Sequence, residues 1–144
     1  DVPVISSDHA PWPAALKDHE RILDNHSGAP GVETLAAVTL GQALVRGQDV
    51  FTRALEGLTI NPARRYGLDS RKGSLEVGKD ADIAVFAADS EAVINESHLH
   101  SNAGWSPYDG LAVGGRITRT ISRGELVWNV GAGLSAMAGR GVIL

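Results

Sequence analysis

The sequence predicts a mixed fold, in which the end of an α/β barrel is followed by a small β domain. Three observations support this prediction. Val2–Ile5 is an apolar, β-branched run with the pattern of a strand buried on both faces, as in a parallel sheet. Three segments with helical patterns follow it, and from about Leu68 glycine and aspartate separate short β-forming runs. We therefore expect two units, residues 1–67 from the barrel and residues 68–144 from the β domain with a carboxyl-terminal arm.

The predicted strand ends on two residues that can carry chemistry, Asp8 and His9, and Pro11 prevents its continuation as a central strand. Polar residues at the carboxyl end of a barrel strand lie where active sites are built, so Asp8 is the first catalytic candidate. The alternative is an aspartate that only caps the following segment. His9 would point to the opposite side of the strand, and we expect it to support the site or pack against it rather than bind a metal.

A long loop, Pro11–Pro30, connects the predicted strand to the first helix. Loops of this length inside a compact domain are usually functional. Its charged stretch, Lys17–Arg21, is expected to be a solvated surface.

Helical patterns cover three segments: Gly31–Val45, Phe51–Leu58 and Asn61–Tyr66. Gly47 is expected to end the first helix, and Asp49 to cap the second. Asn61 and Pro62 would begin the third helix, which Gly67 ends.

The β-forming runs are Ser74–Val77, Ala81–Phe86, Ala92–Ile94, Gly115–Ser122 and Glu125–Trp128. Gly115–Ser122 alternates, and the turn Arg123–Gly124 leads from it into Glu125–Trp128, which predicts a hairpin. Residues 131–141 are rich in glycine and alanine and are expected to form an extended arm.

Composition limits the class of protein. The chain has 144 residues, 43% hydrophobic and 21% charged, with a net charge of −4, which suits one globular domain and gives no reason to expect nucleic acid or a membrane as partner. There is no cysteine, so disulfides and thiolate ligands are excluded. No signal peptide is visible, and we expect a cytoplasmic location. The only methionine is Met137, so we expect the chain to be a piece of a longer polypeptide.

Six motifs occur in order along the chain: Ser7–Pro11, Gly28–Thr34, Asn61–Arg64, Lys72–Asp82, Ser106–Gly110 and Gly139–Gly141. As an ordered set they resemble the carboxyl-terminal third of the cyclic amidohydrolases, the group of dihydroorotase, allantoinase, hydantoinase and dihydropyrimidinase. The resemblance implies that residues 1–67 are the last strand and helices of a TIM-type (β/α)8 barrel. It also implies that residues 68–144 are part of a β-sandwich completed by strands from the start of the polypeptide. Without those strands, the β portion would present unpaired edges.

The resemblance also implies a reaction. In the intact enzyme, a hydroxide held by two zinc ions attacks a cyclic amide or ureide, and Asp8 is a metal ligand and the general acid/base. Ser27 and Gly28 match the loop whose main chain contacts the substrate, although a plain turn before a helix is an equally good interpretation of these two residues. The family's other metal ligands have no counterpart in this chain, so we predict that it forms no catalytic centre and has no activity alone. Homo-oligomers and the missing amino-terminal part are the expected partners.

Trp12 departs from one branch of the group. Dihydroorotases typically carry a histidine at this point, where it binds the substrate carboxylate, and a neutral indole cannot make that contact. We therefore expect Trp12 to form a wall for an uncharged ring. The alternatives are a dihydroorotase, a non-catalytic scaffold that resembles dihydropyrimidinase, and an independent β module. His98 and His100 are spaced like a metal pair, but we interpret them as surface residues away from the barrel mouth.

Overall fold

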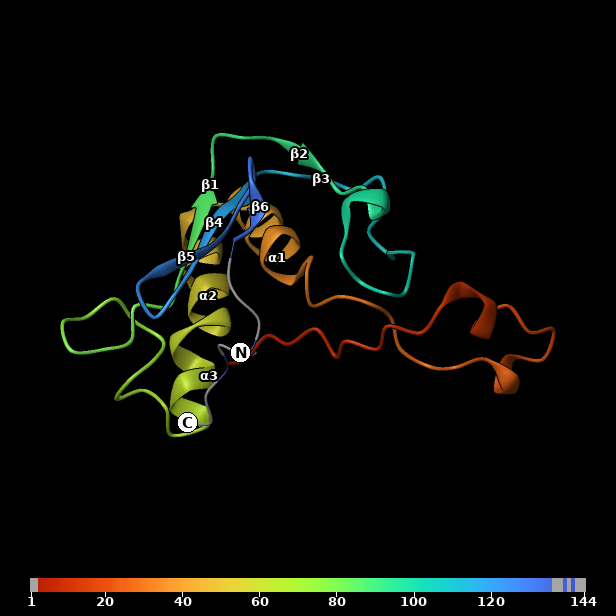
Figure 1. Cartoon of the computed structure of the whole chain (residues 1–144), viewed down its shortest axis with the longest axis horizontal. Helices are drawn as coiled ribbons and strands as arrows, with labels where there is room; N and C mark the ends of the chain where they lie inside the picture. Colours follow the sequence, from red (N-terminus) through yellow and green to blue (C-terminus); the bar gives the residue numbers. More distant parts are fainter. Residues whose placement is uncertain (1–2, 136–138, 140, 142–144) are drawn as a thin grey trace.

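The computed structural model describes residues 3–135, 139 and 141 (Figure 1). Three helices, α1 (Leu35–Leu44), α2 (Gln48–Leu58) and α3 (Ile60–Arg65), follow one another along the chain. They pack beside an antiparallel sheet formed by β1 (Ile83–Ala87), β4 (Arg116–Ser122), β5 (Glu125–Asn129) and β6 (Gly133–Leu134). A separate two-stranded sheet consists of β2 (Ala92–Val93) and β3 (Ala112–Val113). The described part of the chain also contains three short 3-10 helices: η1 (Ala14–Leu16), η2 (Ile22–Asp24) and η3 (Glu96–His98).

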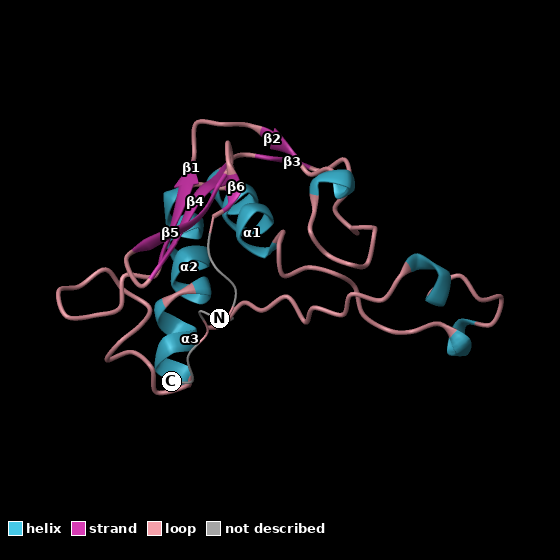
Figure 2. Cartoon of the chain, viewed as in Figure 1, coloured by secondary structure: helices cyan, strands magenta, loops and turns pink. Residues whose placement is uncertain are grey.

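A small apolar core joins the helices to the sheet. Leu40, Ala43 and Ala54 are buried, and partly buried Phe51 and Phe86 pack against them. Figure 2 shows the sheet lying against the helices, while the long loop runs out and back, away from this core. Among the described residues, none of the helices combines the length and the apolar character that crossing a bilayer requires.

The predicted hairpin is confirmed. β4 and β5 pair antiparallel, with Ser122 opposite Glu125, and the turn places Arg123 and Gly124 at φ values of 48° and 79°. Most residues of this strand are partly buried, and only Arg116 and Arg119 are exposed, so the burial does not alternate along it. β1 also forms near its predicted position and pairs with β4.

The helices form where their patterns indicate, but their ends differ. Gly47, with φ 109°, lies directly before α2 and is its N-terminal cap, while its N–H still bonds to the carbonyl of Leu44. Asp49 lies inside the first turn of α2, so its expected capping role is wrong. Asn61 also lies inside a helix, because α3 begins one residue earlier. Gly67 ends α3 with φ 69°, as predicted.

Two predicted strands are absent from the described structure. Residues 3–5 of the run that was expected to be a buried barrel strand are not in a strand, and Val2 lies outside the described residues. A strand requires a neighbouring strand, and with the described part of the chain this segment makes a single main-chain hydrogen bond, from Ile5 N to Gly57 O in a helix at 2.9 Å. Ser74–Val77 is likewise irregular, with Val77 fully exposed. Most of the expected arm after Ser135 lies outside the described residues.

Candidate functional site

Asp8 lies where an extended segment turns into the long loop. Its side chain is exposed and its backbone has φ 45°, in the left-handed region. Only one other residue besides glycine, Arg123, shares that region among the described residues, and there it belongs to a hairpin turn. Aspartate tolerates this conformation better than most side chains, and such backbone positions gather at functional sites.

His9 holds the start of the next helical segment. Its Nδ1 accepts hydrogen bonds from the main-chain N–H groups of Gly31, at 3.0 Å, and Val32, at 3.2 Å. An imidazole nitrogen that accepts two hydrogen bonds carries no proton, so the proton of the neutral ring is on Nε2. His9 is therefore engaged in fixing the loop next to Asp8, and its part in a reaction stays a prediction.

The two ends of the long loop meet beside Asp8. His9 and Ala29 form an isolated parallel bridge, and the N–H of Ala10 donates to the carbonyl of Ala29 at 3.0 Å. Gly28 has φ 87°, and a Cβ at this position would lie 2.6 Å from the Cβ of Ala10. This close approach explains why glycine stands there. Next to it, Ser27 is exposed, and neither its N–H nor its hydroxyl has a hydrogen-bond partner within the described part of the chain.

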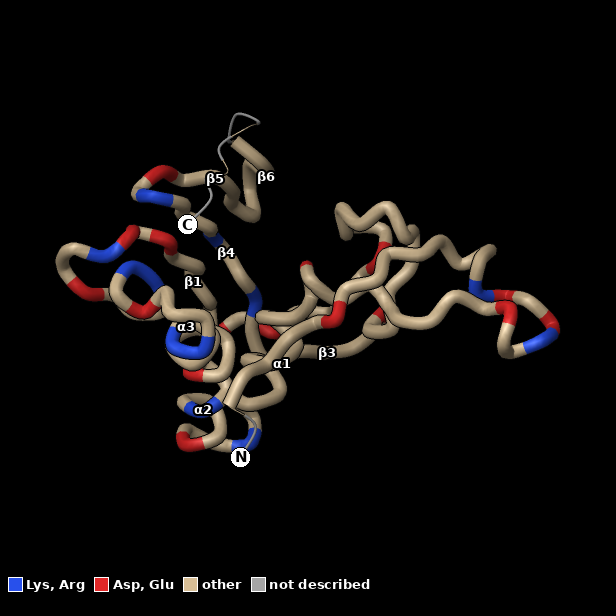
Figure 3. The backbone as a smooth tube through the Cα atoms, turned by 90° about the horizontal axis from the view of Figure 1, so that it is seen from below, with Lys and Arg blue, Asp and Glu red and all other residues tan. Residues whose placement is uncertain are grey.

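Lys17 departs from the solvated surface that was predicted for the charged stretch. It is half-buried, whereas the other residues from 11 to 24 are exposed. Its Nζ donates to the carbonyls of His26, at 2.5 Å, and Gly28, at 2.6 Å. The same Nζ lies 5.7 Å from the centre of the Trp105 ring. In Figure 3 the remaining charged residues of the long loop gather at its outer end.

Trp12 contacts both sides of this neighbourhood. Its ring is 42% exposed and lies against the ring of His26, with centroids 4.5 Å apart. The indole N–H of Trp105 donates to the carbonyl of Trp12 at 2.8 Å. Sequence reasoning missed Lys17 and Trp105, because neither belongs to a periodic pattern and their contacts join residues far apart in the chain.

The segment around His100 lies against the site, and not away from it as expected. Both the main-chain N–H and the Nδ1 of His100 contact the carboxylate of Glu33, at 2.8 and 2.7 Å. Leu99 and Ser101 line a small depression together with His9. The β portion therefore contributes directly to the surroundings of the long loop. His98 and His100 are both exposed, as expected for surface residues.

The large cavity lies elsewhere. A space of about 920 Å³ opens between α1, α2, α3 and the sheet, and its lining is mainly apolar. None of the predicted site residues lines it. The cavity therefore does not contain the predicted site, and the candidate site described here is the region around Asp8.

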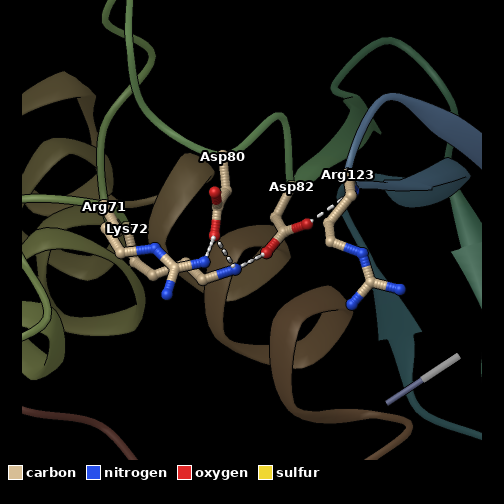
Figure 4. Close-up of polar contacts among 5 residues, drawn as sticks. All are labelled: Arg71, Lys72, Asp80, Asp82 and Arg123. Atoms are coloured by element: carbon tan, nitrogen blue, oxygen red, sulfur yellow. Dashed lines mark hydrogen bonds and ion pairs between the residues drawn. The ribbon is translucent and has the colours of Figure 1, made fainter. Parts of the chain in front are cut away.

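One edge of the cavity carries a cluster of charges, defined by Arg71, Lys72, Asp80 and Asp82 (Figure 4). Lys72 lies between the two carboxylates, 2.8 Å from Asp80 and in contact with Asp82. Arg71 is 3.0 Å from Asp80, and Asp82 accepts a hydrogen bond from the N–H of Arg123 at 2.7 Å. The cluster thus ties residues 71–72 to the β4–β5 turn.

These contacts shift the titration of the cluster. Hydrogen bonds with Asp80 and Asp82 raise the pKa of Lys72 above its ordinary value. The bond from Lys72 is the main cause that lowers the pKa of Asp80 and of Asp82. All three groups are therefore charged at neutral pH, and their role is structural.

The family of the chain follows from a comparison with known protein families. The profile described as "Amidohydrolase family" matches residues 4–127, most of the chain. The chain belongs to the amidohydrolase family. The resemblance drawn from the six sequence motifs is thereby confirmed.

Amidohydrolase relatives with three names align with nearly the whole chain. A dihydroorotase of Halobacterium salinarum is 40% identical over 141 residues, 98% of this chain and 32% of the relative. An allantoinase of Rubrobacter xylanophilus is 36% identical over 140 residues, 97% and 31% of the two chains. A D-phenylhydantoinase of Escherichia coli is 32% identical over 149 residues, 99% and 32%. The chain thus spans about a third of the length of these relatives.

Solved amidohydrolase structures have the same arrangement of helices and strands. A D-hydantoinase from Thermus sp. superposes with a TM-score of 0.86 over 93% of this chain and 30% of that chain, at 24% identity, which shows a shared fold alone. An L-hydantoinase from Arthrobacter aurescens gives a TM-score of 0.73 at 30% identity, over 81% of this chain and 26% of that chain.

The described residues of this amidohydrolase chain do not by themselves meet what a metal site requires. Within residues 3–135, 139 and 141, no three His, Cys, Asp or Glu side chains lie close enough to hold one ion. A zinc site needs three or four protein ligands, and Asp8 offers one carboxylate while the Nδ1 of His9 is occupied by main-chain donors. The donors described here therefore do not fit a complete centre, and further ligands would have to come from outside these residues.

Proposed function

We propose that the chain is part of a hydrolase that opens cyclic amides, such as hydantoin, allantoin or dihydropyrimidine rings, with Asp8 as the general acid/base. The observation that carries the proposal is the match of residues 4–127, which include Asp8, to the amidohydrolase family. Support comes from the left-handed backbone of Asp8 and from the loop of Ser27 and Gly28 that is held beside it.

The proposed chemistry needs two proton transfers at one carboxylate. Asp8 accepts a proton from the attacking water as the new C–O bond forms at the ring carbonyl. It then delivers that proton to the ring nitrogen as the C–N bond breaks. A carboxylate suits both steps because it can act as base and, once protonated, as acid, and such catalysis contributes about 10²- to 10⁴-fold to a rate.

Substrate recognition falls to the long loop. The main chain at Ser27 and Gly28 can exchange hydrogen bonds with the amide of the ring, and Gly28 allows its close approach. The exposed ring of Trp12 offers an apolar wall, which favours an uncharged ring over one that carries a carboxylate.

Several parts of the proposal lie beyond this chain. The proposal includes a divalent metal, with Asp8 as one ligand and the other ligands supplied from outside the described residues. It also includes a barrel unit ending at residue 67, a β-sandwich from residue 68 completed by other strands, a homo-oligomeric state and a cytoplasmic location.

A full-length polypeptide that carries this chain provides the test. Purified with divalent metal, it should open at least one of hydantoin, dihydrouracil, allantoin and dihydroorotate, and Asp8→Asn should lower kcat by about 10²- to 10⁴-fold. Asp18→Asn, a carboxylate in the exposed part of the long loop, is the control and should leave kcat unchanged. Equal activity of the Asp8→Asn variant and the wild type would refute the assigned role.

A dihydroorotase is the second candidate, because the Halobacterium salinarum relative of that name is 40% identical to this chain. The same substrate panel separates the two. A kcat/KM highest for dihydroorotate would favour it, and a kcat/KM highest for an uncharged ring would favour the first candidate.

A further inference from the structure

The contacts of Lys17 indicate a role beyond solubility. A lysine in a charged surface stretch normally keeps its ammonium group in water. Here the ammonium group is drawn to the inner side of the long loop, where it donates to two main-chain carbonyls and lies near the face of Trp105. Charge-assisted hydrogen bonds are shorter and about twice as strong as neutral ones, so this lysine fixes the chain that it binds.

The two carbonyls lie on either side of Ser27. They belong to His26 and Gly28, and no peptide bond described in the chain is cis. In a trans peptide the N–H points opposite to the C=O of the same plane. When the carbonyl of His26 faces Lys17, the N–H of Ser27 must therefore face away from it. That N–H has no partner in the described part of the chain.

Two other contacts hold the main chain of the long loop near Lys17 and Ser27. The N–H of His26 donates to the carbonyl of Leu16 at 3.0 Å, directly before Lys17. Trp105 holds the carbonyl of Trp12 from the β portion. The main chain around Ser27 is therefore held from Lys17 on one side, while its outward N–H is left free for a ligand.

We propose that Lys17 is a positioning residue for substrate binding, which turns the N–H of Ser27 toward the cyclic amide by holding the carbonyls of His26 and Gly28. This inference rests on the proposed function, since it assigns the free N–H to the substrate. Lys17 itself does not touch the reacting atoms.

Three variants of the full-length polypeptide test the role. Lys17→Met removes the ammonium group but keeps most of the side chain's apolar length. Lys17→Arg keeps a cation whose fork can reach two acceptors. Arg21→Met removes a cation from the exposed part of the same loop and is the matched control, because the ion pair of the Arg21 side chain within the described part of the chain is with Asp24, 3.8 Å away at the outer part of the loop.

The first measurement is hydrogen exchange by mass spectrometry on peptides that cover residues 24–29. Because exchange follows local opening, it should rise about tenfold there in Lys17→Met and stay near the wild-type rate in Lys17→Arg and Arg21→Met. Peptides from α1 and α2 report whether each variant is folded. Unchanged exchange in Lys17→Met would overturn the inference, whatever the activity.

The second measurement is steady-state kinetics on the best cyclic amide. Misplaced binding groups cost up to about 100-fold, so Lys17→Met should lower kcat/KM by about 10- to 100-fold, mainly by raising KM, and Lys17→Arg should recover most of the loss. Raised exchange with an unchanged KM would overturn the positioning role. If exchange rises in Lys17→Met but the wild-type polypeptide opens none of the rings, the proposed function is refuted. The role of Lys17 in holding the main chain around Ser27 would then still stand.

Discussion

Replacing Gly28 with alanine measures how tightly the long loop is closed beside Asp8. The added Cβ would lie 2.6 Å from the Cβ of Ala10, whereas carbon atoms in contact prefer about 3.5–4.0 Å. One of the two segments must therefore move by about 1 Å. Two costs add: the left-handed backbone costs alanine about 1–2 kcal/mol, and overpacking costs about 1–3 kcal/mol.

Gly78 provides the control, because its φ of 96° is also left-handed but a Cβ there meets no atom within 4 Å. Gly78→Ala should cost only the backbone part, so Gly28→Ala should lower the free energy of unfolding by about 1–3 kcal/mol more. The assay is urea unfolding of both variants. In the Ala10→Gly background, Gly28→Ala should lose this excess, since the opposing Cβ is gone. Equal costs of Gly28→Ala and Gly78→Ala, or no recovery in the double variant, would refute the reasoning.

Three further predictions concern the charge cluster, the core and the substrate wall. Asp80 and Asp82 have lowered pKa values, so their stabilisation is complete above their ordinary value of 3.8 and is lost as the pH falls below it; the difference in urea midpoint between wild type and Lys72→Met at neutral pH should therefore shrink as the pH falls below 3.8. Leu40 is 5% exposed, so Leu40→Ala should lower the free energy of unfolding by about 2–5 kcal/mol, as measured by urea unfolding. Leu23 is 85% exposed, so Leu23→Ala should lower it by about 0.5 kcal/mol or less in the same assay. Trp12→His should raise kcat/KM for dihydroorotate about tenfold relative to hydantoin, and an unchanged ratio would exclude Trp12 from the substrate wall.

The sequence signals that succeeded are local ones. Two β-forming runs flank the two-residue turn Arg123–Gly124, so the hairpin pairs neighbouring segments of the chain, with Ser122 opposite Glu125. Helices α1 and α2 follow from apolar positions that face one small core around Leu40. The end of α3 was also predictable, because Gly67 alone can adopt the required backbone without strain.

The failures have a common physical cause, which is dependence on distant partners. An apolar run such as residues 2–5 becomes a strand only beside another strand, and no described segment offers one. Lys17 was predicted to be solvated because its acceptors are main-chain carbonyls. Every residue has such a carbonyl, so the sequence does not indicate which ones a lysine will bind. Asp8 could be proposed from the sequence because its residue type and its place after an apolar run, not its contacts, single it out, and its catalytic role stays a prediction.

The contacts of the long loop also change how the two predicted units relate to the site. Trp105 binds the carbonyl of Trp12 across 93 positions of sequence, and His100 binds Glu33 across 67. Both donors come from the side of the chain assigned to the β portion, and both acceptors from the side assigned to the barrel. A division at residue 67 therefore separates the helical part of the chain from the part with the strands. It does not isolate the candidate site, because residues from both parts contact the long loop and the turn before α1. It follows that substitutions at Trp105 or His100 should alter substrate binding, although neither residue lies in the unit that carries Asp8.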